Sequence, residues 1–441
     1  MPGFAFHKPK YCVCRDVQEL RAEVGSFRTG CSPRRHFYKA RAMGHAEAEV
    51  GHNLDCDIAI LGGGLAGGLI ALALHQARPD IRLQLVEAEA SLGGNHIWSF
   101  FKGDVGPEGL ALLEPMITHR WDGYEVRFPA HQRMLNTAYH SIRSGQFDAV
   151  IRDALPENAI RTGAAVASTT NDHVVLESGD EIAARAVIDC RGAGDLDALD
   201  SGWQKFVGLE LELSEPHGLE RPIIMDATVE QIDGYRFVYS LPFGPQNIFV
   251  EDTYYSDGPE LDAALIEARA LAYAESQGWR VAEIVHREKG VLPVVCNGAF
   301  GEYWRSTGAV PKAGVRAGQF HPVTGYSLPD AVRSALFIAG HADLTGEDLH
   351  GRLFARAAQR WRETSYYRML DSMMFYGAGT EDRYKILERF YQLSPALISR
   401  FYAGRSRWTD KLRIVSGKPP IPVGRGLKAI VKSKRRKSRD A

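Results

Sequence analysis

Residues 57–89, DIAILGGGLAGGLIALALHQARPDIRLQLVEAE, contain the segment that decides the fold. The apolar run 57–61 predicts a buried strand, the glycines that follow predict a turn, and residues 68–78 have helical spacing that ends before Pro79. Residues 81–89 alternate apolar and polar side chains, which predicts a second strand that finishes on an acid. The 17 residues 58–74 carry no charge, but their glycines favour a turn and helix over a transmembrane span.

This order of strand, turn, helix, strand and acid predicts a dinucleotide-binding unit of the Rossmann type. Gly62 permits the tight turn, Gly64 lets the backbone approach a pyrophosphate, and Gly67 lets the helix pack close to the strand. The helix N-terminus offers N–H groups and a positive dipole end to the phosphates. Glu87, at the tip of the second strand, is placed to accept hydrogen bonds from the ribose hydroxyls.

Composition sets the outer bounds of the molecule. The chain has 441 residues, 45% hydrophobic and 24% charged, which is typical of a globular protein larger than one domain. A formal net charge of -1 argues against nucleic-acid binding, which calls for a broad basic excess. The six cysteines have neither the spacing of a disulfide framework nor that of a zinc site, so no bound metal is expected. The absence of a disulfide pattern favours the reducing cytosol as the compartment. A metal site that uses Cys12 and Cys14 as ligands is the less favoured alternative.

The two ends of the chain differ from its middle. Residues 1–54 lack a signal-peptide core and periodicity, so we expect a disordered N-terminal extension. Met43 lies shortly before the first strand, and we expect residues 1–42 to be dispensable for folding. Residues 426–441 form a basic tail. Such a tail is usually a solvated end, although it could also contact an anionic membrane surface.

Three later segments favour FAD over NAD as the nucleotide. Gly93 and Gly94 follow the ribose acid directly, where many FAD-binding proteins approach the cofactor a second time, although a simple glycine turn is the alternative. Residues 184–195, ARAVIDCRGAGD, resemble the flavoprotein strand that returns to the adenine side. Residues 317–332, AGQFHPVTGYSLPDAV, with Gly318 and Gly325, resemble the loop and helix that close over the flavin, in preference to FIAGHAD at 337–343.

Taken together, eight motifs resemble the lycopene β-cyclases of bacterial carotenoid synthesis over about residues 57–428. They are GGGLAGGLIALAL, GGNHIWSF, FVGLELEL, PIIMDATV, GYRFVYSLPF, FVEDTYY, RAGQFHPVTGYSLPDAV and RFYAGRSRWTDKLRIVSGKPPIPV. The resemblance implies redox-neutral, acid-initiated cyclisation of the ψ end groups of lycopene to β-ionone rings, through γ-carotene to β-carotene. It also implies bound reduced FAD, with NADPH as a possible priming reductant, and an enzyme classed as an isomerase (intramolecular lyase).

Such a reaction needs a carboxylic acid kept protonated by an apolar setting. Glu210 and Glu212 lie two apart on a predicted strand and therefore face the same side. The family pattern F-x-G-x-E falls on Glu210, which is the first candidate for the general acid. Glu212 is expected to be a solvent-facing carboxylate.

A second acidic cluster ends the strand IFVEDTYY, which is predicted to pair with YRFVYSLPF through a turn at residues 244–245. Without a catalytic role, Glu251 and Asp252 are two acidic residues on an edge strand of a sheet. The resemblance places Glu251 near the flavin, as a cation stabiliser or proton relay. His321 is expected to be a hydrogen-bonding prop or, less favoured, the base that removes the final proton.

The predicted fold class is α/β, with a Rossmann-type FAD domain (55–200 and 305–345), an inserted, largely antiparallel β substrate domain (201–304) and a helical C-terminal region (346–425). The expected partners are lycopene and other linear carotenes, with peripheral contact to the inner face of the membrane from the cytoplasm. Aromatic and basic helical stripes after residue 365 fit either core or membrane contact. A flavin-dependent monooxygenase or reductase on a lipophilic isoprenoid is the alternative function, and a non-catalytic flavin-binding protein is a third.

Overall fold

A computed structural model describes residues 54–417, 424 and 426 of the chain. The predictions for the N-terminal extension, for the pair Cys12 and Cys14, and for nearly all of the basic tail fall outside these residues.

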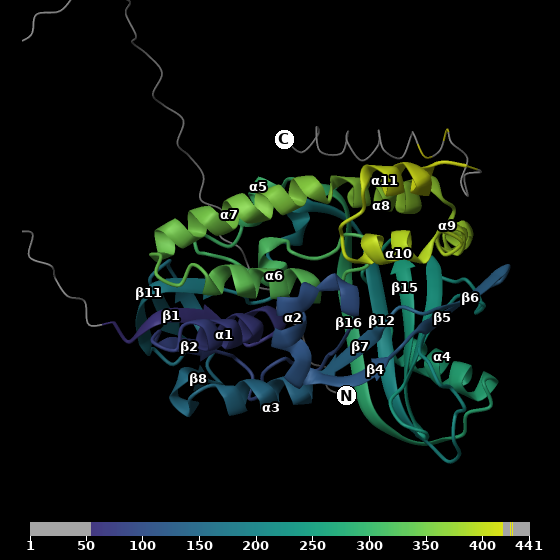
Figure 1. Cartoon of the computed structure of the whole chain (residues 1–441), viewed down its shortest axis with the longest axis horizontal. Coiled ribbons are helices and arrows are strands. Elements are labelled where there is room, and N and C mark those ends of the chain that lie inside the picture. Colours follow the sequence, from purple (N-terminus) through teal and green to yellow (C-terminus); the bar gives the residue numbers. More distant parts are fainter. Residues whose placement is uncertain (1–53, 418–423, 425, 427–441) are drawn as a thin grey trace, which may run out of the picture. The chain divides into compact units, whose positions relative to one another are not determined.

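The strands form three sheets (Figure 1). A six-stranded sheet has the order β8-β2-β1-β11-β10-β9, and its strands are β8 (Ile160–Arg161), β2 (Leu83–Val86), β1 (Cys56–Leu61), β11 (Glu181–Asp189), β10 (His173–Leu176) and β9 (Val166–Thr169). A seven-stranded sheet has the order β16-β12-β15-β14-β13-β5-β6, and its strands are β16 (Val281–Gly298), β12 (Leu199–Leu213), β15 (Asn247–Ser256), β14 (Tyr235–Pro242), β13 (Ile223–Asp226), β5 (Tyr124–Phe128) and β6 (His131–Leu135). A small third sheet has the order β3 (Ile97–Phe101), β7 (Tyr139–Arg143) and β4 (Ile117–Trp121).

The six-stranded sheet carries the predicted nucleotide-binding unit. β1 pairs in parallel with both β2 and β11, and helix α1 (Leu65–Ala77) crosses between β1 and β2. Ile58 and Ile60 pack on one face with α1, whereas Ala59 and Leu61 pack on the other, as the period of a strand dictates. α1 is apolar on all sides because α6 (Leu328–Ala339) packs against it as well.

The seven-stranded sheet is antiparallel except where β13 pairs with β5. The predicted hairpin of GYRFVYSLPF with IFVEDTYY is β14 and β15, in register from Tyr235–Tyr255 to Pro242–Ile248. One face packs on α4 (Ala263–Ser276) through Leu209, Leu211 and Val250. The opposite face of β12 carries Phe206, Gly208 and Glu210, because side chains alternate along a strand.

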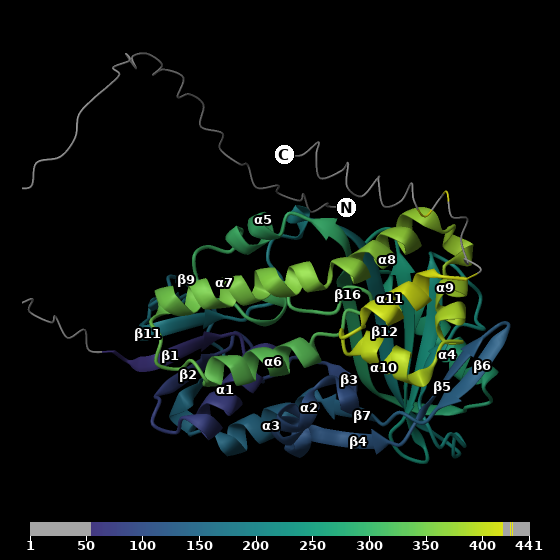
Figure 2. The same ribbon diagram turned by 45° about the horizontal axis from the view of Figure 1, so that its top comes forward.

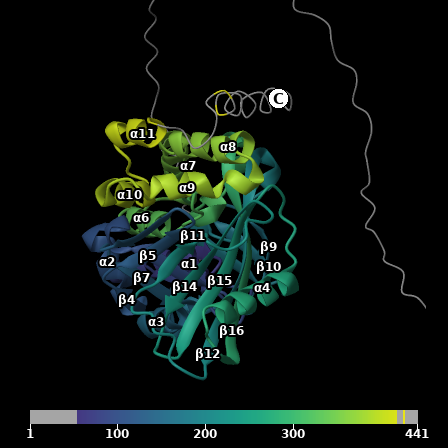
Figure 3. The same ribbon diagram turned by 90° about the vertical axis from the view of Figure 1, so that its right-hand side faces the viewer.

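Helices cover both sheets. α2 (Gly106–Leu113), α3 (Ser144–Ala154), α6 and α7 (Gly346–Glu363) accompany the six-stranded sheet, with α5 (Phe300–Arg305) packing on α7 (Figure 2). α8 (Ser365–Gly377), α9 (Tyr384–Phe390), α10 (Pro395–Tyr402) and α11 (Trp408–Val415) gather at one end of the seven-stranded sheet (Figure 3). The aromatic stripes of α8 to α10 are largely core, with Tyr367, Phe375, Tyr391 and Phe401 buried.

The architecture agrees with the predicted α/β class and helical C-terminal region. The large β-sheet also includes β5 and β6, which precede residue 200, so the segment 201–304 does not supply all of its strands. Among the described helices, none combines the length and apolar character needed to cross a bilayer.

Candidate active site

A cavity of about 630 Å³ connects the nucleotide-binding turn to the seven-stranded sheet. Of the residues predicted to bind the cofactor, six line it: Gly62, Gly64, Glu87, Gly93, Gly94 and Gly325. Gly67 and Gly318 do not line it, and among the predicted catalytic residues only Glu251 does.

The glycines of the first turn have separate physical roles. Gly62 has φ of +95°, a conformation that favours glycine. A Cβ on Gly67 would lie 1.9 Å from the carbonyl oxygen of Gly62, so this glycine lets α1 pack on the turn. A Cβ on Gly64 would meet nothing within 4 Å and would project into open space beside the cavity. Gly64 is also the N-cap of α1 and supplies no side-chain cap, which leaves the first helical N–H groups available to a phosphate.

Glu87 is fixed beside this turn. Its carboxylate accepts hydrogen bonds from the N–H of Gly63 at 2.6 Å and of Glu89 at 3.0 Å. Each carboxylate oxygen has a further lone pair, so the group can still accept a ribose hydroxyl.

The second glycine pair and the late loop also border the cavity. Gly93 and Gly94 have φ of +80° and +65°, and Gly93 donates its N–H to the Gly63 carbonyl at 2.9 Å. Gly314 was not predicted. It has φ of +64°, and a Cβ there would lie 2.5 Å from that of Ala66 at the start of α1. Gly318 follows the short helix Gly314–Ala317 and ends it in the left-handed conformation. Its role is therefore to form this turn of the backbone, not to line the cavity.

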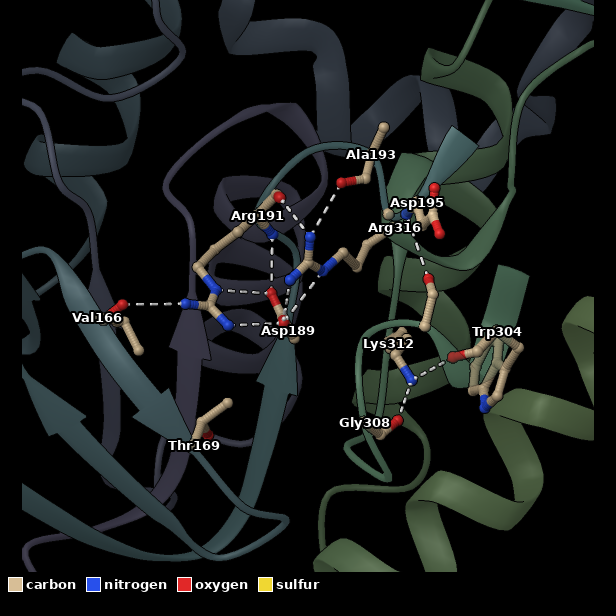
Figure 4. Close-up of polar contacts among 12 residues, drawn as sticks. Val166, Thr169, Asp189, Arg191, Ala193, Asp195, Trp304, Gly308, Lys312 and Arg316 are labelled. Atoms are coloured by element: carbon tan, nitrogen blue, oxygen red, sulfur yellow. Dashed lines mark hydrogen bonds and ion pairs between the residues drawn. The ribbon is translucent and has the colours of Figure 1, made fainter. Parts of the chain in front are cut away.

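A buried carboxylate ties the return strand to this late loop (Figure 4). Asp189, at the end of β11, accepts two hydrogen bonds from the Arg191 side chain at 2.9 Å, one from the Arg191 backbone N–H at 3.0 Å and one from Arg316 at 3.1 Å. Arg316 also donates to the carbonyl of Ala193 at 2.9 Å. Burial raises the pKa of Asp189, but the hydrogen bonds and charge of Arg191 outweigh it and hold the pKa below its usual range. The loop that carries Arg191 and Gly192 along the cavity is thereby fixed.

Lys312, just before the late loop, holds the segment 304–312 together (Figure 4). Its ammonium group donates to the carbonyls of Trp304 at 2.9 Å and Gly308 at 2.6 Å. Burial lowers the pKa of Lys312 to about 8. The contacts with two carbonyls indicate a structural anchor.

The far end of the cavity is a row of residues across four strands. Glu251 of β15 pairs with Gly208 of β12 and with Tyr239 of β14, and Glu288 of β16 pairs with the other side of Gly208. Tyr239, Glu251 and Glu288 line the cavity. A Cβ on Gly208 would lie 2.2 Å from the ring of Phe249, so the glycine makes room for this ring between the two carboxyl-bearing strands.

Glu251 has the properties expected of an acid. Burial raises its pKa from 4.5 to about 8, and the negative charge of Glu288 adds to the effect. The Thr253 hydroxyl donates to Glu251 Oε1 at 2.7 Å. Burial therefore favours the protonated form of this carboxyl group, which lies in a cavity wall rich in aromatic rings, among them Tyr139, Tyr239 and Phe249.

Glu288 is a site residue that the sequence analysis missed. Its carboxylate accepts the N–H of Ile97 at 3.2 Å and lies 3.0 Å from Nδ1 of His96, and its side chain is buried. It stands in the charged, alternating stretch VHREKG, which is typical of an exposed strand. Only the pairing of β16 with β12 brings it to the cavity.

The structure separates Glu210 from the cavity. Its carboxylate accepts a hydrogen bond from Arg143 at 2.7 Å, and Arg143 lies over the ring of Phe243 at 4.4 Å. Glu210 is not among the residues that line the cavity, and its assignment as the general acid stays a prediction from its motif. Glu212 is half-buried beside Asn247 instead of fully solvent-facing.

Asp252 and His321 are also turned away from the cavity. Asp252 projects from the opposite face of β15, where Arg236 donates to both of its oxygens at 2.9 Å. His321 donates from Nε2 to the Phe401 carbonyl at 3.0 Å and accepts the Thr324 N–H at Nδ1. Burial lowers the pKa of His321 to about 3, so it remains neutral, and its contacts are those of a prop.

The residues fit FAD on the observations above: an open approach at Gly64, uncapped helical N–H groups and a fixed ribose acid. Within residues 54–417, no group of three or more metal-binding side chains comes together.

Comparison with known proteins identifies the family of this chain. Residues 57–428 match the family described as lycopene cyclase protein. A lycopene beta-cyclase of Pantoea ananas is 42% identical, with 86% of this chain and 99% of that protein covered. A lycopene beta-cyclase of a Paracoccus species is 46% identical, with 85% and 97% covered.

Solved structures share the fold at low identity. HpxO of Klebsiella pneumoniae, solved in complex with FAD and uric acid, has a TM-score of 0.59 at 14% identity over 79% of this chain and 96% of that one. A geranylgeranyl bacteriochlorophyll reductase-like protein of Thermoplasma acidophilum has a TM-score of 0.54 at 13% identity, with 85% and 99% covered. These neighbours establish a flavoprotein fold, and the family match with the more similar relatives establishes that the chain belongs to the lycopene cyclase family.

Proposed function

We propose that this chain is a lycopene β-cyclase that closes β-ionone rings on the ψ end groups of lycopene, through γ-carotene to β-carotene, with Glu251 as the general acid. The observation that carries the assignment is the position of the Glu251 carboxyl in the wall of the cavity that begins at the FAD cradle, where burial raises its pKa. The relatives of 42–46% identity are themselves lycopene beta-cyclases.

The chemistry follows from the substrate. Glu251 gives its proton to the terminal trisubstituted alkene, which forms one C–H bond and leaves a tertiary cation. A neighbouring double bond of the polyene attacks the cation and closes the six-membered ring. Loss of a ring proton to a base then forms the ring alkene, so atoms and electrons balance without net oxidation or reduction. The reaction class is that of an isomerase, an intramolecular lyase.

The cavity wall supports the cationic steps. The rings of Tyr139, Tyr239 and Phe249 line the cavity, and the π-face of an aromatic ring stabilises a carbocation as it stabilises an ammonium ion. The carboxylates of Glu288 and of deprotonated Glu251 are the candidates for the final base, because both line the cavity. When bound in reduced form, FAD would add negative charge near the cation, and NADPH would serve only to prime that reduction.

The apolar substrate implies contact with a membrane, because a C40 carotene partitions into the bilayer. We therefore place the protein at the cytoplasmic face of the membrane as a peripheral protein. Lycopene and other linear carotenes are its proposed substrates.

The test supplies purified, FAD-loaded protein with lycopene in detergent micelles and measures products by chromatography and NADPH consumption by absorbance. A cyclase yields γ-carotene and β-carotene, with less than one NADPH consumed per ring. One NADPH per product would instead identify a monooxygenase or reductase, and an absence of product would reject the proposal.

A further inference from the structure

We propose that α11 and the basic residues beside it form the surface by which this protein docks on an anionic phospholipid bilayer. The inference names the contact surface for the membrane association proposed above. The observations that support it are the exposed apolar face of α11 and the positive charges of the residues around that face.

α11 presents its large apolar side chains to solvent. Trp408 is 73% exposed, Leu412 57% and Val415 43%. Positions i, i+4 and i+7 share one face of a helix, so the three side chains form a continuous stripe. Scattered exposed apolar residues need no explanation, but a helical stripe headed by an exposed tryptophan is typical of a helix lying in a membrane interface.

The opposite face of α11 is anchored to the protein. Asp410 accepts hydrogen bonds from Arg400 of α10 at 2.6 and 2.7 Å, and Ile414 packs on the aromatic core. The Tyr366 hydroxyl of α8 donates to the carbonyl of Lys411 at 2.8 Å. The apolar stripe is therefore held outward by a fixed helix.

The charges around the stripe are of one sign. Arg405, Arg407, Lys411 and Arg413 stand in or just before α11, and the only acid between residues 405 and 417, Asp410, is turned inward and paired. In sequence, residues 418–441 add nine lysines and arginines against one aspartate. Each basic residue near an anionic surface strengthens attraction to it, so this charge favours an acidic bilayer as the occupant.

The positive charge continues beside the helix. Arg405 also lines a cavity of about 240 Å³ in which arginines outnumber carboxylates; its charged lining residues are Arg333, Arg356, Arg360, Arg405, Asp330 and Glu363. Neighbouring α10 touches the active-site wall, since the ring of Tyr402 contacts that of Tyr326, which lines the main cavity. Docking through α11 would therefore bring the bilayer close to the wall of the carotene site.

The first experiment measures sedimentation of full-length, FAD-loaded protein with vesicles of phosphatidylcholine, alone or mixed with phosphatidylglycerol. We expect binding to the mixed vesicles, about tenfold weaker for Trp408→Ala with Leu412→Ala. The triple change Arg407→Gln, Lys411→Gln and Arg413→Gln should weaken binding and its salt dependence. Met134→Ala is the matched control, because Met134 is 69% exposed on β6, and it should bind as the wild type does.

A second measurement places the helix directly. Brominated lipids should quench part of the tryptophan fluorescence of the bound protein. The variant Trp408→Phe keeps an apolar ring and should still bind vesicles, but the quenched part of the fluorescence should be absent. Unchanged quenching in Trp408→Phe, or unchanged binding in the Trp408→Ala, Leu412→Ala variant, would overturn the proposal. A halving of the native mass in that variant would identify a second copy as the occupant and would also overturn it. Cyclisation of micellar lycopene tests the proposed function separately, and both surface variants should retain it.

Discussion

Glu251 and Glu288 flank Gly208 on opposite sides, each as its direct partner on a neighbouring strand. Two strand spacings separate their backbones, about 10 Å, and both carboxyl groups line the same cavity. Burial and the charge of Glu288 favour the neutral form of Glu251. Two carboxyl groups that line one cavity thus stand across a single glycine.

This relationship predicts the pH dependence of cyclisation. The pKa of Glu251 is raised from 4.5 to about 8, so the active protonated form is lost as the pH rises through about 8. Glu288→Gln removes a negative charge and lowers that pKa, which should move the alkaline limb of the rate profile to lower pH, by on the order of one unit. The control, Glu212→Gln, lies outside the cavity lining and should leave the limb in place. A limb unmoved by Glu288→Gln would contradict the coupling.

The same pKa shift affects stability. A carboxyl with a raised folded-state pKa contributes stability that is complete below about pH 4.5 and is lost as the pH rises through about 8. The melting temperature of the wild type should therefore fall as the pH rises from 4.5 to about 8, and that of Glu251→Gln should fall less. Scanning calorimetry at several pH values would measure this difference.

The two candidate acids are distinguished by paired substitutions. Glu251→Gln should lower the rate of cyclisation about 10²–10⁴-fold, because the proton donor is lost, while FAD stays bound. Glu210→Gln weakens the ion pair with Arg143 outside the cavity and should cost the rate much less. Single-turnover rates of cyclisation should be measured for both variants, and flavin absorbance is the control that shows whether each still binds FAD. The reverse ranking would return the acid to Glu210.

Proton-initiated cyclisation predicts a label from the solvent. The proton of Glu251 exchanges with water between turnovers, so reaction in heavy water should place one deuterium on the ring carbon that was protonated. Mass spectrometry of the β-carotene formed gives the count of deuterium per ring. Unlabelled rings would rule out protonation by any exchangeable group.

Gly64→Val should abolish FAD binding with little loss of fold. The Cβ of the new side chain would meet no protein atom within 4 Å and would project beside the cavity, so we expect the valine to block the cofactor while the fold is kept. Gly145→Val is the matched control, since Gly145 also has open space but lies outside the cavity lining. Gly67→Ala should destabilise the fold itself, because its Cβ would lie 1.9 Å from the Gly62 oxygen. Flavin absorbance and circular dichroism separate the two effects.

Asp371 of α8 is fully buried, and neither of its carboxyl oxygens has a hydrogen-bond partner among the described residues. Burial raises its pKa well above 3.8, so the stability linked to its protonation is present at low pH and is lost as the pH rises. Asp371→Asn should raise the free energy of unfolding at pH 8 by about 1–3 kcal/mol.

Asp410→Asn is the opposite control. Hydrogen bonds from Arg400 lower the pKa of Asp410, so its contribution is present at neutral pH and is lost as the pH falls. This variant should therefore be destabilised at neutral pH in urea denaturation. A destabilised Asp371→Asn variant at pH 8 would show that the carboxylate has a partner.

The nucleotide-binding unit could be predicted from sequence because its determinants are local. The turn at Gly62, the open approach at Gly64, the packing at Gly67 and the acid at Glu87 all lie within one βαβ segment, where spacing alone places them. The β14–β15 hairpin was predicted for the same reason, since a short turn sets its register.

The end of the cavity on the seven-stranded sheet was decided by tertiary structure. Glu210 has the better motif and lies on the same face of β12 as Gly208, but it forms an ion pair with Arg143 and is not among the residues that line the cavity. Glu251 and Glu288, far apart in sequence, both line the cavity because β15 and β16 both pair with β12. Asp189 and Arg316 are likewise joined only in the fold. Sequence spacing specifies contacts within an element and its neighbour, whereas the pairing of distant strands and the burial that raises the pKa of Glu251 exist only once the whole sheet has formed.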